Sequence, residues 1–168
     1  MAHRLAGKVA MVTGGASGIG EATCRLCVRE GARGVVIGDV TDAAGQALAA
    51  GLASPESSVL FQHLDVSQEA QWAAAIRAVL DRNGRLDILV NNAGISVVSS
   101  GMPSVEGTTE ESWERVLGVN AKGVFLGMKH AIPAMRQSGG GSIVNIASDE
   151  SRYMTGSELV IDGGISSR

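Results

Sequence analysis

Residues 8–20 read KVAMVTGGASGIG, an apolar run that passes directly into a loop rich in glycine. The apolar run, Lys8 to Thr13, has the length of a short buried strand. Beyond the loop, apolar residues recur at helical spacing from Glu21 to Glu30, and Gly31 is a natural helix stop. The segment therefore predicts a strand, a glycine loop and a helix in succession.

The same alternation of strand and helix continues along the chain. Further strands are predicted at Gly34 to Asp39, Val59 to Asp65, Leu86 to Asn91 and Ser142 to Ala147, and further helices at Asp42 to Ala53, Gln68 to Arg82, about Glu110 to Leu117 and about Asn120 to Gln137. The strands are apolar throughout, as expected when helices cover both faces of a parallel sheet. We therefore predict an α/β fold with a Rossmann-like, doubly wound parallel sheet, in one domain over residues 1–168.

The amino-acid composition limits the classes of partner that this chain is expected to bind. Hydrophobic residues make up 45% of the 168 residues and charged residues 18%, which is typical of a folded globular chain. The net charge is −3 and the 14 basic residues are scattered, so we expect neither nucleic acid nor an anionic membrane as a partner. No apolar run approaches the length that spans a bilayer, and the N-terminal residues lack the pattern of a signal peptide. The sequence thus predicts a cytoplasmic protein.

The two cysteines, Cys24 and Cys27, form a CxxC pair. No second pair is present to complete a zinc tetrad, and both residues fall within an apolar helical pattern. We interpret them as small buried helix residues and predict no metal site.

The loop from Thr13 to Gly20 has the pattern TGxxxGxG. Positions without side chains let the backbone approach a pyrophosphate, and the free N–H groups at the start of the next helix stabilise its charge. A plain turn is the alternative, but the flanking strand and helix favour a dinucleotide site. The positions of this loop that we predict to bind the cofactor are Gly14, Ser17, Gly18, Ile19 and Gly20.

Asp39 ends the second predicted strand, 19 residues beyond Gly20. An acid at about this spacing hydrogen-bonds a ribose hydroxyl of the dinucleotide. A carboxylate here would repel a 2′-phosphate, and neither the loop nor the Val40-Thr41 pair supplies a basic side chain to neutralise one. The sequence therefore predicts NAD rather than NADP as the cofactor.

Taken together, the motifs resemble those of the short-chain dehydrogenase/reductase family. They are the loop from Thr13 to Gly20, Asp65-Val66 after the third strand, Asn91-Asn92-Ala93-Gly94 after the fourth, Asn120 in GVNAKGVF, and SIVNIAS at residues 142–148. The resemblance covers residues 5–148 in the family's order. It implies an NAD-dependent oxidoreductase that moves a hydride between the nicotinamide and a small-molecule secondary alcohol or ketone, for example a hydroxysteroid-like one, and that forms a homo-oligomer.

The resemblance also implies a role for each matching residue. Asp65 and Val66 would hold the adenine, while Asn91, Ala93 and Gly94 would support the cofactor and the central strand. Asn120 would belong to the catalytic group, and Ser148 would bond the substrate oxygen. The stretch Ala147 to Ser151 also resembles the family's text just before the last strand, so Ser148 could instead belong to that side of the chain.

Local explanations compete with three of these roles. Asp65 could cap the next helix, the Asn91 to Gly94 stretch could form a turn alone, and Asn120 could cap a helix start. These alternatives stay open at the level of sequence.

The family's proton-transfer pair, a tyrosine with a lysine four residues later, has no counterpart in this chain. The one tyrosine, Tyr153, stands five residues after Ser148 and is not followed by a lysine at that spacing. The lysines are Lys8, Lys122 and Lys129. Residues 149–164, DESRYMTGSELVIDGG, instead resemble the family's last strand and its closing DGG.

We infer an internal deletion at about residues 148–150, with the fold truncated on the side after the fifth strand. This loss would leave part of the predicted helix at 120–137 uncovered, at Val124, Phe125, Met128 and Ile132, and so favour self-association.

Three readings of the chain follow. The first is a short-chain oxidoreductase that is catalytically impaired or inactive. The second is a non-catalytic dinucleotide-binding fragment or variant that associates with a full-length partner. The third is that the natural protein carries an internal segment that this sequence omits, in which case its mass would be well above 17.2 kDa.

Overall fold

The structure is a computed structural model that describes residues 3–96 and 105–146. Three sequence-based predictions lie outside the described residues: the role of Ser148, the placement of Tyr153, and the junction at about 148–150.

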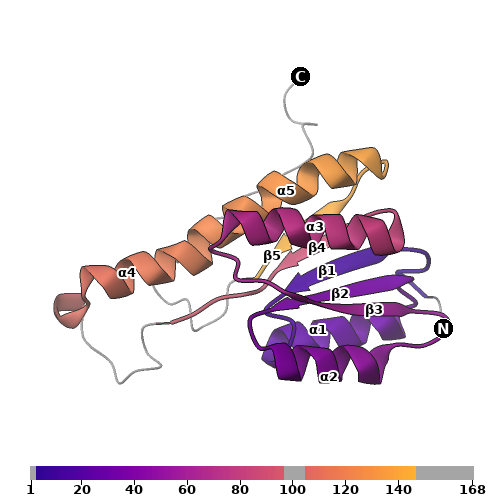
Figure 1. Cartoon of the computed structure of the whole chain (residues 1–168), viewed down its shortest axis with the longest axis horizontal. Helices are drawn as coiled ribbons and strands as arrows, with labels where there is room; N and C mark the ends of the chain where they lie inside the picture. Colours follow the sequence, from indigo (N-terminus) through magenta and orange to yellow (C-terminus); the bar gives the residue numbers. More distant parts are fainter. Residues whose placement is uncertain (1–2, 97–104, 147–168) are drawn as a thin grey trace.

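Five parallel strands form a single sheet in the order β3-β2-β1-β4-β5 (Figure 1). The strands are β1 (Val9–Thr13), β2 (Gly34–Asp39), β3 (Ser58–His63), β4 (Ile88–Asn91) and β5 (Ser142–Asn145). The helices are α1 (Gly18–Arg29), α2 (Asp42–Leu52), α3 (Glu69–Asn83), α4 (Glu110–Leu117) and α5 (Gly123–Gln137). Helices α1 and α2 cover one face of the sheet, and α3 and α5 cover the other. The doubly wound, Rossmann-like fold predicted from the sequence is therefore confirmed.

The continuous apolar runs of the strands are explained by two separate cores. In β1, Val9 and Met11 belong to the core beneath α3 and α5, whereas Ala10 and Val12 belong to the core beneath α1 and α2. All four side chains are fully buried, because alternate residues of a strand point to opposite faces of the sheet. A strand covered on both sides needs apolar residues at every position.

Several element boundaries differ from the sequence-based prediction. Helix α1 begins at Gly18 rather than Glu21, so the end of the glycine loop already forms the first helical turn. Strand β3 ends at His63, which places Asp65 in the connection beyond the strand. The two helices predicted at 110–117 and 120–137 run on from one another through a π-helical segment, Gly118–Lys122. Such π-helical insertions occur often at functional sites.

The prediction of an uncovered face on α5 is wrong at one position. Phe125 is 55% exposed, but Met128 is only 8% exposed. Met128 lies on the same side of α5 as Ala131 and Met135, which are buried against the sheet. Val124 and Ile132 are half-buried. Within residues 3–96 and 105–146, no helix is both long and apolar enough to cross a membrane.

Asp87 ties the start of β4 to the start of β1. Its side chain is 3% exposed; Oδ2 accepts the Val9 N–H at 2.9 Å, and Arg85 donates to both carboxylate oxygens at 2.8 and 2.5 Å. Burial raises the pKa of the Asp87 carboxyl, but the hydrogen bonds from Arg85 and Val9 outweigh burial and lower the pKa below its usual value. The ionised form is therefore the form that stabilises the fold.

Replacement of Asp87 by asparagine is expected to make the free energy of unfolding less dependent on pH in the acid range. A carboxyl group whose pKa is lower in the folded than in the unfolded protein stabilises the fold at pH values above its unfolded pKa, which is about 4. This stabilisation disappears as the pH falls through the folded-state pKa. At pH 7 we expect Asp87→Asn to cost about 2 kcal/mol, since Arg85 is partly exposed and remains solvated. Urea denaturation between pH 3 and pH 7 measures both effects. Equal slopes of stability against pH in the two proteins would contradict this role of Asp87.

Candidate functional site

A cavity of about 660 Å³ opens at the carboxyl ends of the strands. It lies where the chain order of the sheet reverses, with β2 and β3 on one side of β1 and β4 and β5 on the other. Ligands of open α/β sheets bind in such a crevice. Nine residues predicted from the sequence line this cavity: Gly14, Ser17, Gly18, Ile19, Asp39, Asp65, Val66, Ala93 and Gly94.

The three glycines of the loop that belong to the TGxxxGxG pattern have different physical roles. Gly14 adopts a positive φ of 62°, and a Cβ there would come within 2.9 Å of the Ala93 Cα. Gly18 has a φ of 54°, and a Cβ there would meet nothing within 4 Å, so this position faces open space at the cavity. Gly20 does not line the cavity, because it is the point where α1 packs against the Gly14 carbonyl and the Asn92 side chain.

The start of α1 is left available for a ligand. Ser17 is the N-cap residue of α1, its backbone is extended, and its hydroxyl makes no capping hydrogen bond. The N-terminal N–H groups of a helix attract anions. Ser17 and this first turn therefore form an edge of the cavity with the chemistry suited to an anion.

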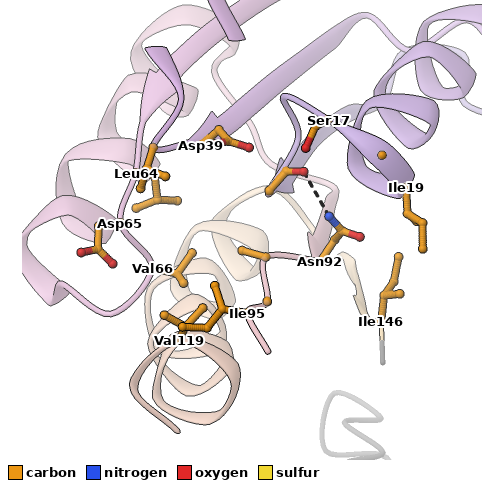
Figure 2. A pocket seen from close by; sticks show the side chains of 15 residues that line it. Ser17, Ile19, Asp39, Leu64, Asp65, Val66, Asn92, Ile95, Val119 and Ile146 are labelled. Atoms are coloured by element: carbon orange, nitrogen blue, oxygen red, sulfur yellow. Dashed lines mark hydrogen bonds between the residues drawn. The ribbon is translucent and has the colours of Figure 1, made fainter. Parts of the chain in front are cut away.

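Asp39 joins the end of β2 to the glycine loop. Its Oδ2 accepts the Ala16 N–H at 3.0 Å, its Oδ1 accepts the Thr41 N–H at 2.9 Å, and the residue is 9% exposed. Figure 2 shows the carboxylate turned toward the loop that carries Ser17. Each carboxylate oxygen keeps a second lone pair for a ligand hydroxyl.

Asn92 clamps the end of β4 to the glycine loop. It was not among the cofactor-binding residues predicted from the sequence. Its Nδ2 donates to the Thr13 carbonyl at 3.0 Å and to the Gly14 carbonyl at 3.2 Å (Figure 2, dashed line for Gly14). The backbone N–H groups of Asn92 and Ala93 both donate to the Thr13 hydroxyl at 3.0 Å. The signal was present, since Asn92 is the second residue of the NNAG motif.

Asn91 lies under the site rather than in its lining. It is 3% exposed, and its Nδ2 donates to the Asn145 Oδ1 at 2.9 Å. This bond joins the side chains of β4 and β5. The position is compatible with a supporting role for Asn91 in the central strand.

Asp65 lines the cavity and also forms a local turn. Its Oδ1 accepts hydrogen bonds from the Ser67 N–H at 2.9 Å and from the Ser67 hydroxyl at 2.8 Å, directly ahead of α3. Asp65 can thus form the local turn and line the cavity at the same time. The neighbouring Val66 is 6% exposed and contributes an apolar wall.

The sequence allowed Asn120 to be the cap of a helix start, but it is not a helix cap in the structure. It lies within the π-helical segment, where its Oδ1 accepts the Ile95 N–H and its Nδ2 donates to the Ile95 carbonyl, both at 2.9 Å. Asn120 does not line the cavity, although its neighbour Val119 and its partner Ile95 do. The side chain therefore positions the segment that follows β4.

Other lining residues were not selected from the sequence. They are Val40, Leu64, Asn92, Ile95, Val119 and Ile146. Most are apolar, and Figure 2 shows Ile19 and Ile146 facing one another across the mouth of the cavity. Apolar side chains at these positions can pack against the flat faces of aromatic rings.

Cys24 and Cys27 are buried, as predicted, with exposures of 0% and 6%. Burial raises the pKa of the Cys24 thiol to about 12, so this group is an inert thiol at neutral pH. In the part of the chain that the structure describes, no group of three or more histidine, cysteine, aspartate or glutamate residues could hold a metal ion.

Comparison with known proteins gives consistent matches. A family model described as short chain dehydrogenase matches residues 8–158. The 3-alpha-(or 20-beta)-hydroxysteroid dehydrogenase of Mycobacterium tuberculosis is 45% identical over 150 residues, which cover 89% of this chain and 55% of that protein. The 3-beta-hydroxysteroid dehydrogenase of Comamonas testosteroni is 46% identical over 148 residues, which cover 88% of this chain and 55% of that protein.

A solved structure has the same fold. The 3-ketoacyl-(acyl-carrier-protein) reductase of Brucella melitensis, in a crystal structure of its complex with NADH, matches with a TM-score of 0.79 and 36% identity. The match covers 86% of this chain and 58% of that chain. The chain therefore spans little more than half the length of the proteins that it resembles.

Proposed function

Because the chain belongs to the short-chain dehydrogenase family, we propose that it binds NAD⁺ or NADH in the cavity at the carboxyl ends of the strands. The observation that carries the proposal is the position of Asp39, a carboxylate fixed against the glycine loop by the Ala16 and Thr41 N–H groups. The complex of the Brucella reductase with NADH supports a nicotinamide cofactor.

The described residues fit the parts of a dinucleotide. The N–H groups at the start of α1 and the Ser17 hydroxyl would bind the pyrophosphate, next to the open side of Gly18. Asp39 would accept hydrogen bonds from the adenosine ribose, while Asp65 and Val66 would hold the adenine. Ala93, Gly94 and Ile95 line the cavity beyond the end of β4, where the nicotinamide would lie.

The preference for NAD over NADP rests on charge. A 2′-phosphate would meet the Asp39 carboxylate, and among the described residues the cavity lining contains no lysine or arginine to neutralise it. The adjacent Val40, which is 59% exposed, adds only an apolar surface. We therefore propose that NADP(H) binds more weakly than NAD(H).

We further propose that this chain binds the cofactor with little or no turnover. A bound nicotinamide supplies the hydride acceptor or donor of an alcohol–ketone oxidoreduction. The protein must move the accompanying proton, and the sequence offers one tyrosine, Tyr153, without a lysine four residues later. The loss of a positioned proton donor typically slows a reaction by about 10²- to 10⁴-fold. Ser148 remains a proposed substrate-binding residue and Asn120 a proposed member of the catalytic group.

For a catalytically complete form of the protein, we propose a small-molecule secondary alcohol or ketone of hydroxysteroid type as substrate. The names of the mycobacterial and Comamonas relatives support this class. The alternative is a binding unit that associates with another copy or with a full-length partner. Exposed Phe125 on α5 and Val144 on β5, at 55% and 46% exposure, favour such an association.

Titration with the reduced cofactors tests the binding proposal. NADH fluorescence, followed while protein is added, should show saturable binding, and NADPH should bind at least about tenfold more weakly, equivalent to about 1.4 kcal/mol. A folded protein that binds neither cofactor would overturn the proposal. Equal affinities for NADH and NADPH would overturn only the role of Asp39 in cofactor preference.

A further inference from the structure

Trp72 is a buried aromatic residue close behind the cavity wall. It lies in the first turn of α3, is 0% exposed, and does not itself line the cavity. Its Nε1–H donates to the Val66 carbonyl at 2.9 Å. The hydrogen bond therefore joins Trp72 to Val66, a residue that does line the cavity.

Two glycines of α5 make room for this arrangement. A Cβ at Gly123 would lie 2.7 Å from the Val66 Cγ2, and a Cβ at Gly127 would lie 2.8 Å from the Trp72 Cη2. Both distances are too short for real carbon contacts. Helix α5 thus approaches both side chains closely.

We propose that Trp72 is a positioning residue for the adenine side of the cavity, an inference that rests on the proposed binding of NAD(H). The connection through Asp65 and Val66 follows β3, beyond the hydrogen bond that joins the Leu64 N–H to the Asp39 carbonyl at 2.9 Å. A buried indole N–H requires an acceptor, and the Val66 carbonyl supplies it. The bond fixes the peptide that follows Val66, and with it the apolar wall that would meet the adenine.

The replacement Trp72→Phe removes the N–H and retains an aromatic ring. We expect affinity for AMP, which carries the adenine half alone, to fall about tenfold, and affinity for NADH to fall by the same factor. A general structural effect would weaken NADH more than AMP, because the nicotinamide half would also lose contacts. The matched control is Trp113→Phe, since Trp113 is 54% exposed on α4 and is absent from the cavity lining.

A second measurement uses the unaltered chain and does not depend on the folding of the variant. The two indole N–H resonances in a ¹⁵N NMR spectrum can be assigned with Trp113→Phe. Saturation with AMP should shift the Trp72 resonance and leave that of Trp113 in place.

The outcomes separate the inference from the proposed function. Unchanged AMP affinity in Trp72→Phe, a larger loss for NADH than for AMP, or a Trp72 resonance unmoved by AMP would each overturn the positioning role. Failure of the unaltered chain to bind NADH would instead overturn the proposed function.

Discussion

Replacement of Gly20 by alanine is expected to abolish NADH binding and to lower the free energy of unfolding by about 3 kcal/mol. A Cβ at this position would run into the Gly14 carbonyl oxygen and would lie 2.7 Å from the Asn92 Nδ2. Neither neighbour can move freely, because Asn92 holds the Thr13 and Gly14 carbonyls. The added methyl group must therefore push α1 away from the loop and distort the predicted phosphate site.

A loss of stability in Gly20→Ala would be diagnostic, because alanine favours a helix over glycine by about 1 kcal/mol and would otherwise stabilise α1. The matched control is Gly51→Ala in α2, where a Cβ would meet nothing within 4 Å. We expect the control to gain about 0.5 to 1 kcal/mol and to bind NADH normally. Urea denaturation and NADH titration measure both variants. Wild-type affinity in Gly20→Ala would show that close packing of α1 on the loop is unnecessary.

The second large effect is expected at Asp39. Replacement by asparagine should weaken NADH about 10- to 100-fold and remove most of the discrimination against NADPH. The amide keeps one oxygen acceptor, but its NH₂ group would face one of the two backbone N–H donors, Ala16 or Thr41. The variant also lacks the negative charge that repels a 2′-phosphate.

Asp42→Asn provides a control of the same chemistry three residues along the chain. Asp42 is exposed, contacts His63 at 2.6 Å, and does not line the cavity. Its replacement should leave both cofactor affinities within about twofold, as for a surface substitution. If Asp39→Asn retained the wild-type ratio of NADH to NADPH affinity, the charge argument for cofactor preference would fail.

The parts of the site that the sequence predicted are those governed by local chain chemistry. The glycine loop and Asp39 were predictable because one strand-loop-helix unit and the end of the next strand bring them together. Asn92 was missed although its motif was identified, since its side-chain bonds to Thr13 and Gly14 join residues 79 and 78 positions apart. Contacts of that kind depend on the pairing of β1 with β4.

Tertiary packing also explains the errors in the predicted helices. The sequence predicts a break between 117 and 120, but the chain continues through a π-helical segment held by the pair of hydrogen bonds between Asn120 and Ile95. Met128 was predicted to be uncovered because the segment after the fifth strand is missing, but it is only 8% exposed. Apolar periodicity identifies a helix face but does not say how wide a stripe the core will cover.

We propose that binding and turnover are separated in this chain, because the described cavity does not depend on the proton-transfer pair of the family. The cavity is lined by residues at and just beyond the ends of β1 to β4, by the start of α1, by Val119 of the π-helical segment, and by Ile146 just beyond β5. Among the residues that the structure describes, none in this lining is a tyrosine or a lysine.

The most direct test combines mass, binding and turnover on one sample. The chain should have an intact mass near 17.2 kDa, should bind NADH saturably, and should reduce little or no NAD⁺ when given a panel of secondary alcohols, including hydroxysteroids. Alcohol-dependent formation of NADH by protein of that mass at an ordinary enzymatic rate, about 1 s⁻¹ or faster, would contradict the account, because efficient catalysis would then proceed without the tyrosine and lysine pair.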